Sequence, residues 1–218
     1  MKPVVLALFL AFAGVTASAQ DPVTTLPEAY QVQLDNDWVK VVRVHYAAGA
    51  KLAEHTHPAG TTAYVYLNDS EGVVFRHAGG SNRAVTRPAV QAGGIRLAGG
   101  SEEHHTAENP AATPSDFLRI QIKTITGNRN LRQRIPRPTL RPGENSITVD
   151  YTSEPLVIQR FVIAAGKSME VVAATMPSLW IALPSGDTRW ISEARNETIV
   201  NTGTTPMEFV RVIVRDAK

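Results

Sequence analysis

The sequence predicts an all-β chain made of two similar antiparallel domains in tandem. Residues 43–49 recur without a gap as residues 160–166, and residues 105–119 recur as residues 197–211. Short segments rich in β-branched and aromatic residues run through both halves, mostly alternate in polarity, and are separated by glycine-rich turns. Apart from a short turn near residues 25–30, nothing after the first 19 residues has the apolar stripe of a helix. We therefore expect two antiparallel sandwiches or barrels.

The first 19 residues have the pattern of a secretory signal peptide. Lys2 supplies the positive end, residues 3–15 are an apolar run, and residues 17–19 read Ala-Ser-Ala, which fits the small-residue cleavage rule. The run is shorter than the roughly 20 apolar residues that span a bilayer. We expect cleavage before Gln20 and export to the periplasm or the extracellular space, with no membrane association afterwards.

Composition excludes several function classes. Loss of the signal removes Lys2 and no acid, so the formal charge falls from +2 to +1, which gives no electrostatic case for nucleic acid or anionic membranes. The chain has no cysteine, and it lacks a G-x-S-x-G elbow, a glycine-rich phosphate loop and a Cys-x-x-Cys pair. Disulfide stapling is therefore excluded, and serine nucleophiles, nucleotide transfer and thiol exchange are unsupported.

Taken in order, the strands place one domain on each side of a linker. The clearest strand segments are residues 38–46, 63–67, 72–76, 117–122, 156–163, 179–183 and 209–214. Residues 22–126 form the first domain, residues 146–218 the second, and residues 127–145 are rich in arginine and proline. Proline at such spacing disfavours helix interiors and central strands. We interpret the linker arginines as a solvated connection that also packs on one barrel; an anion site is the alternative.

Three histidines in the first domain suggest a metal site. Residues two apart on a strand share a face, so His55 and His57 can both point into a barrel, and His105 begins another strand. Imidazole suits Fe, Cu, Ni or Zn. The alternative is that His55 and His57 are surface residues near a strand end. The repeat places Val172, Ala174 and Glu197 at the three corresponding positions, so metal chemistry is expected only in the first domain.

These residues resemble the motifs of the cupin superfamily. The first motif, G-x5-H-x-H, matches Gly49, His55 and His57, and the second ends H-x3-N, matched by His105 and Asn109. The resemblance extends over residues 30–217. It implies two jelly-roll barrels, the second degenerate, with the three histidines holding one divalent transition metal: Fe, Mn, Zn, Ni or Cu. It also implies a small-molecule ligand or substrate, and Asn109 as a residue near the site.

The sequence departs from the family pattern in two places. The glutamate expected after the second histidine is replaced by Thr61 or Thr62, which favours a three-histidine site. The proline and glycine expected before the last histidine are replaced by a Gly-Gly-Ser-Glu-Glu stretch. Its Glu102 or Glu103 could act as a substitute ligand, although adjacent acids beside a turn are usually solvated. Strand alternation sends His104 outward, or into a role supporting the ligands.

Other residues near the expected cavity have plainer interpretations. Tyr64 and Tyr66 share a strand face and either line a pocket or form core. Arg43 and Arg119 recur as Arg160 and Arg211, so we interpret them as structural residues that bond loop carbonyls. His45 and His77 have no counterparts in the second half, and we expect satisfied or exposed strand residues.

Two functions remain open at this level. One is a metal-dependent oxygenase, lyase or isomerase of cupin type that acts on a small organic molecule. The other is a non-catalytic binding or structural protein in which the metal is a staple. A polar cavity would favour the enzyme, and a cavity packed solid by Tyr64, Tyr66 and Phe75 would favour the second function. A homo-oligomer is compatible with both.

Overall fold

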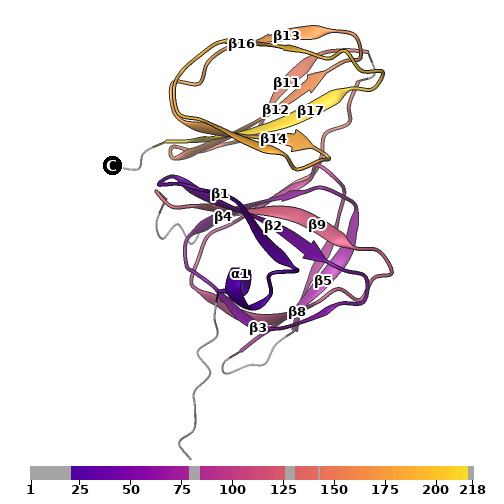
Figure 1. The fold of residues 1–218 in the computed structure, drawn as a ribbon, viewed down its shortest axis with the longest axis vertical. Coiled ribbons are helices and arrows are strands. Elements are labelled where there is room, and N and C mark those ends of the chain that lie inside the picture. Colours follow the sequence, from indigo (N-terminus) through magenta and orange to yellow (C-terminus); the bar gives the residue numbers. More distant parts are fainter. Residues whose placement is uncertain (1–20, 79–83, 126–130, 142, 216–218) are drawn as a thin grey trace, which may run out of the picture.

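The structure, a computed structural model, describes residues 21–78, 84–125, 131–141 and 143–215. Two β-barrels are stacked on each other, one from each half of the chain (Figure 1). The all-β prediction is confirmed. The expected signal peptide, residues 1–19, lies outside the described residues. Within those residues, no helix has the length and apolar character needed to cross a membrane.

The N-terminal barrel consists of two antiparallel sheets and one short helix. The sheets have strand orders β1-β2-β9-β4-β7-β10 and β3-β8-β5-β6. Their elements are α1 (Pro22–Thr25), β1 (Tyr30–Asp35), β2 (Val39–Tyr46), β3 (Lys51–His57), β4 (Thr61–Tyr66), β5 (Ser70–His77), β6 (Ala84–Val90), β7 (Ile95–Ala98), β8 (Glu103–Glu108), β9 (Ser115–Ile122) and β10 (Arg132–Ile135).

Helix α1 lies at one opening of the N-terminal barrel (Figure 1). Asp21 caps its N-terminus, where the side chain accepts a hydrogen bond from the Val23 amide, and Pro22 occupies the first turn, where its missing N–H costs nothing. Val23, Leu26 and Ala29 pack against the interior of the barrel. This segment therefore covers that opening and leads directly into Tyr30, the first residue of β1.

The C-terminal barrel is smaller. Its sheets have orders β11-β12-β17-β14-β15 and β13-β16. The strands are β11 (Ser146–Thr152), β12 (Leu156–Ile163), β13 (Ser168–Val171), β14 (Ser178–Leu183), β15 (Thr188–Ile191), β16 (Glu197–Val200) and β17 (Met207–Val214).

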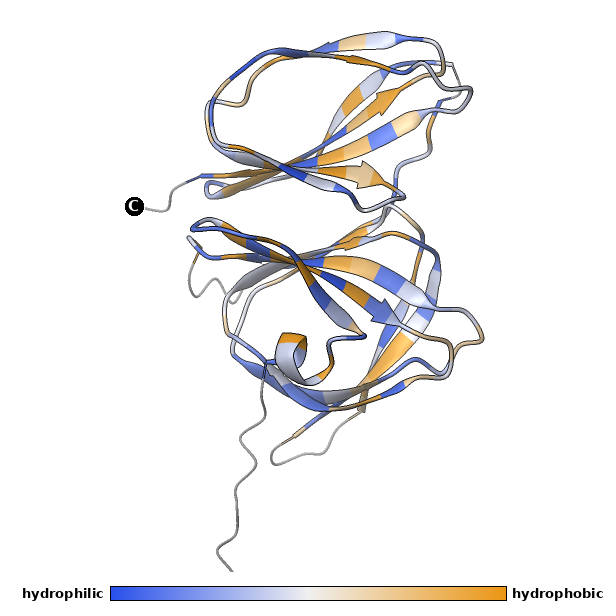
Figure 2. Ribbon diagram, in the orientation of Figure 1, coloured by the Kyte–Doolittle hydropathy of each residue, from blue (hydrophilic) through white to orange (hydrophobic). Residues whose placement is uncertain are grey.

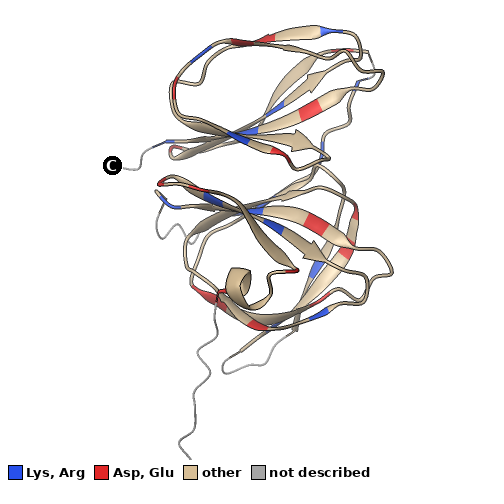
Figure 3. Ribbon diagram, viewed as in Figure 1, with Lys and Arg blue, Asp and Glu red and all other residues tan. Residues whose placement is uncertain are grey.

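The largest apolar cluster lies between the barrels, because the long sheet of each is buried on both faces (Figure 2). On β2, Val39 and Val41 face the other barrel, whereas Val42 and Val44 face the barrel interior. Strands β12, β14 and β17 contribute the opposing apolar residues. Acidic and basic residues are interspersed over both barrels rather than gathered on one face (Figure 3).

Two recurring arginines hold this interface together in a reciprocal way. Arg43 donates to the carbonyl of Ser185 at 2.8 Å, and Arg160 donates to the carbonyl of Gly93 at 2.7 Å. Each acceptor lies in the turn before a short strand of the opposite long sheet, β15 or β7. Arg160 also pairs with Asp150 and Glu208 and is 1% exposed. The interpretation that this pair bonds loop carbonyls is confirmed.

The predicted linker contains a strand that the sequence did not reveal. Strand β10 pairs with β7 and forms an edge of the N-terminal barrel, a position where the nearby prolines do no harm. Arg137, two residues after β10, donates to the carboxylate of Glu208 on β17. Linker arginines therefore contact both barrels. Residues 127–130 and 142 of this segment lie outside the described residues.

Candidate metal centre

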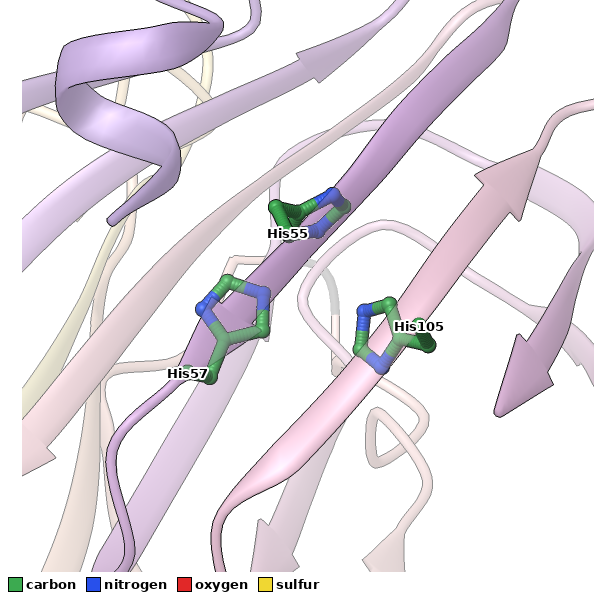
Figure 4. A group of neighbouring side chains, drawn as sticks. All are labelled: His55, His57 and His105. Atoms are coloured by element: carbon green, nitrogen blue, oxygen red, sulfur yellow. The ribbon is translucent and has the colours of Figure 1, made fainter. Parts of the chain in front are cut away.

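Strands β3 and β8 bring the three predicted histidines together inside the N-terminal barrel (Figure 4). His55 and His57 share one face of β3, and His105 pairs directly with His55 across the antiparallel ladder. The ring centroids lie 5.0 Å apart for His55 and His57, 4.8 Å for His55 and His105, and 5.2 Å for His57 and His105. The expectation that these side chains point into the barrel, rather than lie on the surface, is confirmed.

Burial fixes the protonation of this cluster. His55, His57 and His105 are 0%, 6% and 1% exposed. Burial lowers the pKa of all three imidazoles, that of His105 to about 2, and the charge of Arg119 further lowers the pKa of His57. The histidines are therefore neutral at pH 7, the form in which a ring nitrogen can bind a metal.

Hydrogen bonds set the tautomer of His55. Its Nδ1 lies 2.8 Å from the carbonyl oxygen of Ala53, which can only accept, so Nδ1 carries the proton. The lone pair of Nε2 then faces the cluster, where it accepts from the hydroxyl of Tyr30 at 2.9 Å. A backbone carbonyl that orients a ring in this way is the usual support of a metal-binding histidine.

His105 supplies the strongest indication of a ligand site. Both of its ring nitrogens are buried, and neither has a hydrogen-bond partner among the described residues. Buried polar groups are normally paired, because an unpaired one costs about 1–3 kcal/mol. The potential ligand nitrogens of the three histidines lie within 4.8 Å of one another. Three neutral imidazoles at this spacing, one of them unpaired, fit a divalent transition metal.

The C-terminal barrel has no such cluster among its described residues. A bulge in β3 between Leu52 and His55 inserts one residue that β13 lacks. Val171 therefore opposes Glu197 in the ladder, and Val172, which the sequence repeat aligned with His55, is 72% exposed. The sequence repeat is therefore wrong by one residue at this point, because Val171, and not Val172, takes the ladder position of His55. Glu197 itself pairs with Arg189 and Arg195.

Two of the other predicted pocket residues are corrected by the structure. Thr61 shares a strand face with Ala63 and points away from the histidines, so Thr62 lines the cavity beside His57 instead. Asn109 does not reach the cluster. Its amide donates to the carbonyls of Tyr46, Ala47 and Thr113, and Asn201 makes the equivalent bonds to Ile163 and Thr205. Asn109 is therefore a loop anchor common to both barrels.

The acidic pair before His105 divides between two environments. Glu103 lies on the same face of β8 as His105, borders the cavity beside His57 and lies 3.6 Å from Arg87. Glu102 is exposed and borders only a wider neighbouring cavity. His104 points outward, as expected, with Nε2 3.4 Å from Glu54. The acid nearest the site is therefore Glu103, and neither acid belongs to the ligand cluster.

The remaining histidines follow the plainer interpretation in part. His45 is half-exposed, with Nδ1 2.7 Å from Asp116. His77 stacks edge-on against His105, with ring centroids 5.3 Å apart, and borders the wider cavity. His77 is thus a neighbour of the cluster that the absence of a motif concealed.

The barrel interior combines aromatic packing with open space. Tyr64 and Tyr66 are 4% and 5% exposed and pack in the interior cluster, and Tyr64 also lines a cavity of about 70 Å³ beside His57. Arg119 and Thr62 border the same cavity. A wider cavity of about 480 Å³ adjoins it, and Glu103 lines both cavities. Arg87 and Arg96 line the wider cavity.

Sequence reasoning missed Tyr30, Arg87 and Arg96 as contributors to the site. Tyr30 hydrogen-bonds to His55 and, at 2.6 Å, to Tyr46. Arg87 lies over the ring of Phe75, 3.9 Å from its centroid, and Arg96 lies 5.1 Å from that of Tyr64. Strand periodicity could have placed Tyr30 in a strand, but β6, which carries Arg87, has Pro88 and little apolar pattern.

Comparisons with known proteins bear on the fold. No protein-family model and no curated protein matches the sequence. Among solved structures, AerE from Microcystis aeruginosa superposes with a TM-score of 0.58 at 13% identity, over 85% of this chain and 91% of that one. The R92A mutant of oxalate decarboxylase OxdC from Bacillus subtilis superposes with a TM-score of 0.56 at 10% identity, over 90% and 72%. Identities this low speak for the fold alone, and the chain has the cupin fold, in two tandem jelly-roll barrels.

Proposed function

We propose that the N-terminal barrel binds one divalent transition metal through His55, His57 and His105, and that the protein is a metal-dependent enzyme acting on a small organic molecule. The observation that carries this proposal is His105, buried with both ring nitrogens unpaired beside two further neutral imidazoles. A metal held there would polarise an oxygen atom of a substrate.

The cavity supports a reactive site over a purely structural metal. Tyr64, Tyr66 and Phe75 are buried, yet they leave an open volume of about 70 Å³ that touches His57. Its wall includes the polar side chains of Thr62 and Arg119. A metal that only stapled the fold would require neither open space nor an uncompensated cation beside it.

A non-catalytic binding protein is the second candidate, and the small size of this cavity favours it. Pockets for drug-sized ligands occupy several hundred Å³, so only a compact molecule or one end of a larger molecule fits beside His57. The carboxylate that borders the cavity, Glu103, lies 3.6 Å from the guanidinium of Arg87, whose positive charge offsets its own. Turnover, rather than binding, must therefore be measured directly.

Metal analysis of untagged protein tests the metal assignment. The wild type is expected to hold close to one ion per chain, and the His55→Ala, His57→Ala double variant none. His45→Ala removes a histidine from the outer surface of the same barrel and should retain the metal. Equal metal content in the double variant and the wild type would reject the site. A screen of organic acids, sugars and phenols with the metal-loaded protein then tests for turnover.

We also propose that the protein is exported to the periplasm or the extracellular space and that the mature chain begins at Gln20. The support is the sequence pattern of residues 1–19. Mass spectrometry of the protein from its native host tests this, since an intact N-terminus would contradict it.

A further inference from the structure

One arginine occupies corresponding positions in the two barrels but has different surroundings. On β9, Arg119 lies between Val42 of β2 and Tyr64 of β4 in the cross-strand register. On β17, Arg211 lies between Gln159 of β12 and Trp180 of β14. The register makes Val42 the counterpart of Gln159, and Tyr64 that of Trp180.

Arg211 is satisfied within its barrel. It donates to Oε1 of Gln159 at 2.9 Å and to the carbonyl of Val172 at 3.0 Å. Its guanidinium lies over the rings of Phe161 and Trp180, 4.9 and 5.2 Å from their centroids. The cavity there holds only about 10 Å³. The C-terminal barrel therefore uses this arginine as a filled, paired core residue, as the sequence interpretation expected.

Arg119 has none of these partners. Valine at position 42 cannot accept a hydrogen bond, and no described residue accepts one from Arg119 or forms an ion pair with it. The side chain is nevertheless 6% exposed, and its Nε is fully buried. The interpretation that Arg119 bonds a loop carbonyl is wrong for the described residues, although it holds for Arg211.

A buried guanidinium without an acceptor is costly, since arginine cannot lose its proton to relieve the burial. The cavity that Arg119 borders also touches His57. The charged residues that line the adjoining wider cavity are four arginines and two acids, namely Arg87, Arg96, Arg132, Arg134, Glu102 and Glu103. Among them, Glu103 lies 3.6 Å from Arg87. With Arg119, the two cavities are thus lined by five arginines and two carboxylates, and this excess of positive charge favours an anion.

We propose that Arg119 binds the carboxylate of a small organic acid in the cavity beside His57, which makes it the residue that selects the ligand. This assignment rests on the proposed function, because it places the carboxylate next to the histidine cluster. A guanidinium and a carboxylate match in shape as well as in charge, through two parallel N–H···O bonds. The wider cavity, with Arg87 and Arg96, accommodates the rest of the acid.

Three variants separate this role from a structural one. Arg119→Gln removes the charge, whereas Val42→Gln keeps the arginine and restores the internal acceptor that Gln159 provides to Arg211. Arg76→Gln is the matched control, since it removes one exposed arginine from β5 of the same barrel. The probes are acetate and malonate, with acetamide and malonamide as uncharged analogues. Binding is measured by calorimetry in chelator-treated and Zn²⁺-loaded protein, and metal content is determined in parallel.

We expect at least one of the two carboxylates to bind wild type and Arg76→Gln with similar affinity. Both Arg119→Gln and Val42→Gln should bind it about tenfold or more weakly, since charge-assisted hydrogen bonds carry discrimination of this size. The amides should not bind. Unchanged affinity in Arg119→Gln, equal binding of an amide, or failure of both carboxylates to bind the wild type would overturn the assignment. If Val42→Gln does not fold, as circular dichroism would show, Arg119→Gln against Arg76→Gln decides.

The two proposals can fail separately in this experiment. Arg119 is not a ligand, so all variants should hold as much zinc as the wild type. A wild type that binds no zinc but binds a carboxylate through Arg119 would contradict a zinc site at the three histidines and sustain the anion site. Full zinc content, together with carboxylate binding that is unchanged in Arg119→Gln, would sustain the metal site and overturn the anion site.

Discussion

Replacing His105 by leucine is expected to stabilise the metal-free protein and to abolish its stabilisation by metal. His105 is 1% exposed, and its two ring nitrogens have no partner in the described residues. If each unpaired group costs about 1 kcal/mol, the low end of the usual range, leucine should gain about 2 kcal/mol in the absence of metal. For a chain of this size, that raises the melting temperature by about 4–8 °C.

Metal should reverse the order of the melting temperatures of the wild type and the leucine variant. An ion at a thousandfold excess over Kd adds about 4 kcal/mol to the stability of the wild type, or about 8–16 °C, and adds nothing to a variant that lacks a ligand. Differential scanning calorimetry with chelator and with excess metal measures all four melting temperatures. The leucine variant should melt higher in chelator, and the wild type should melt higher in metal.

His45→Leu provides the control, since His45 is half-exposed and paired with Asp116. This variant should lose at most about 1 kcal/mol and keep the full metal response. A His105→Leu variant that is less stable than the wild type in chelator would contradict this expectation, because the ring nitrogens must then be satisfied. Equal stabilisation of that variant and the wild type by metal would also contradict it.

Three further predictions follow from the interface and from burial. Arg160→Met should lower the free energy of unfolding by about 3–5 kcal/mol, because it leaves Asp150 and Glu208 buried with fewer partners. Arg43→Met, which loses one hydrogen bond, should lower it by about 1 kcal/mol. Equal losses for the two variants in urea denaturation would contradict this. Residues 143–218 expressed alone should associate or stay unfolded, because Leu179, Val210 and Val212 would lose their cover; a stable monomer by light scattering would refute the shared core. Chelator-treated protein should lose stability as the pH falls below about 6.5. Burial lowers the folded-state pKa of the three clustered histidines, so below this pH the unfolded chain binds more protons than the folded one. Melting temperatures that stay constant between about pH 7.5 and 5 would contradict this.

The fold could be predicted from the sequence where the residues alternate in polarity or where the two halves repeat. Strands β2, β9, β12 and β17 are apolar on both faces or alternate strongly, and all were predicted. The edge strands β10 and β11 were not predicted, because an edge strand needs no apolar pattern. Strand β11 exposes Ile147 and Val149, and β10 lies in a segment with the composition of a linker. The three histidines were found because period two and the motif spacing agree. The bulge before His55 was not found, since a single inserted residue leaves no trace in composition.

Arg119 shows why repetition alone misled the interpretation of the site. The repeat preserves the arginine, but its role depends on the residue opposite it in the ladder, and that residue changes from Gln159 to Val42. The C-terminal barrel pairs its arginine with the glutamine and leaves a cavity of only about 10 Å³. In the described residues of the N-terminal barrel, Arg119 and His105 are instead buried and unpaired, and Arg119 borders open space. Buried unpaired groups lower stability, and they persist where a ligand supplies the missing partner. The contrast between two barrels of the same fold therefore supports the proposal that the ligand site lies in the first of them.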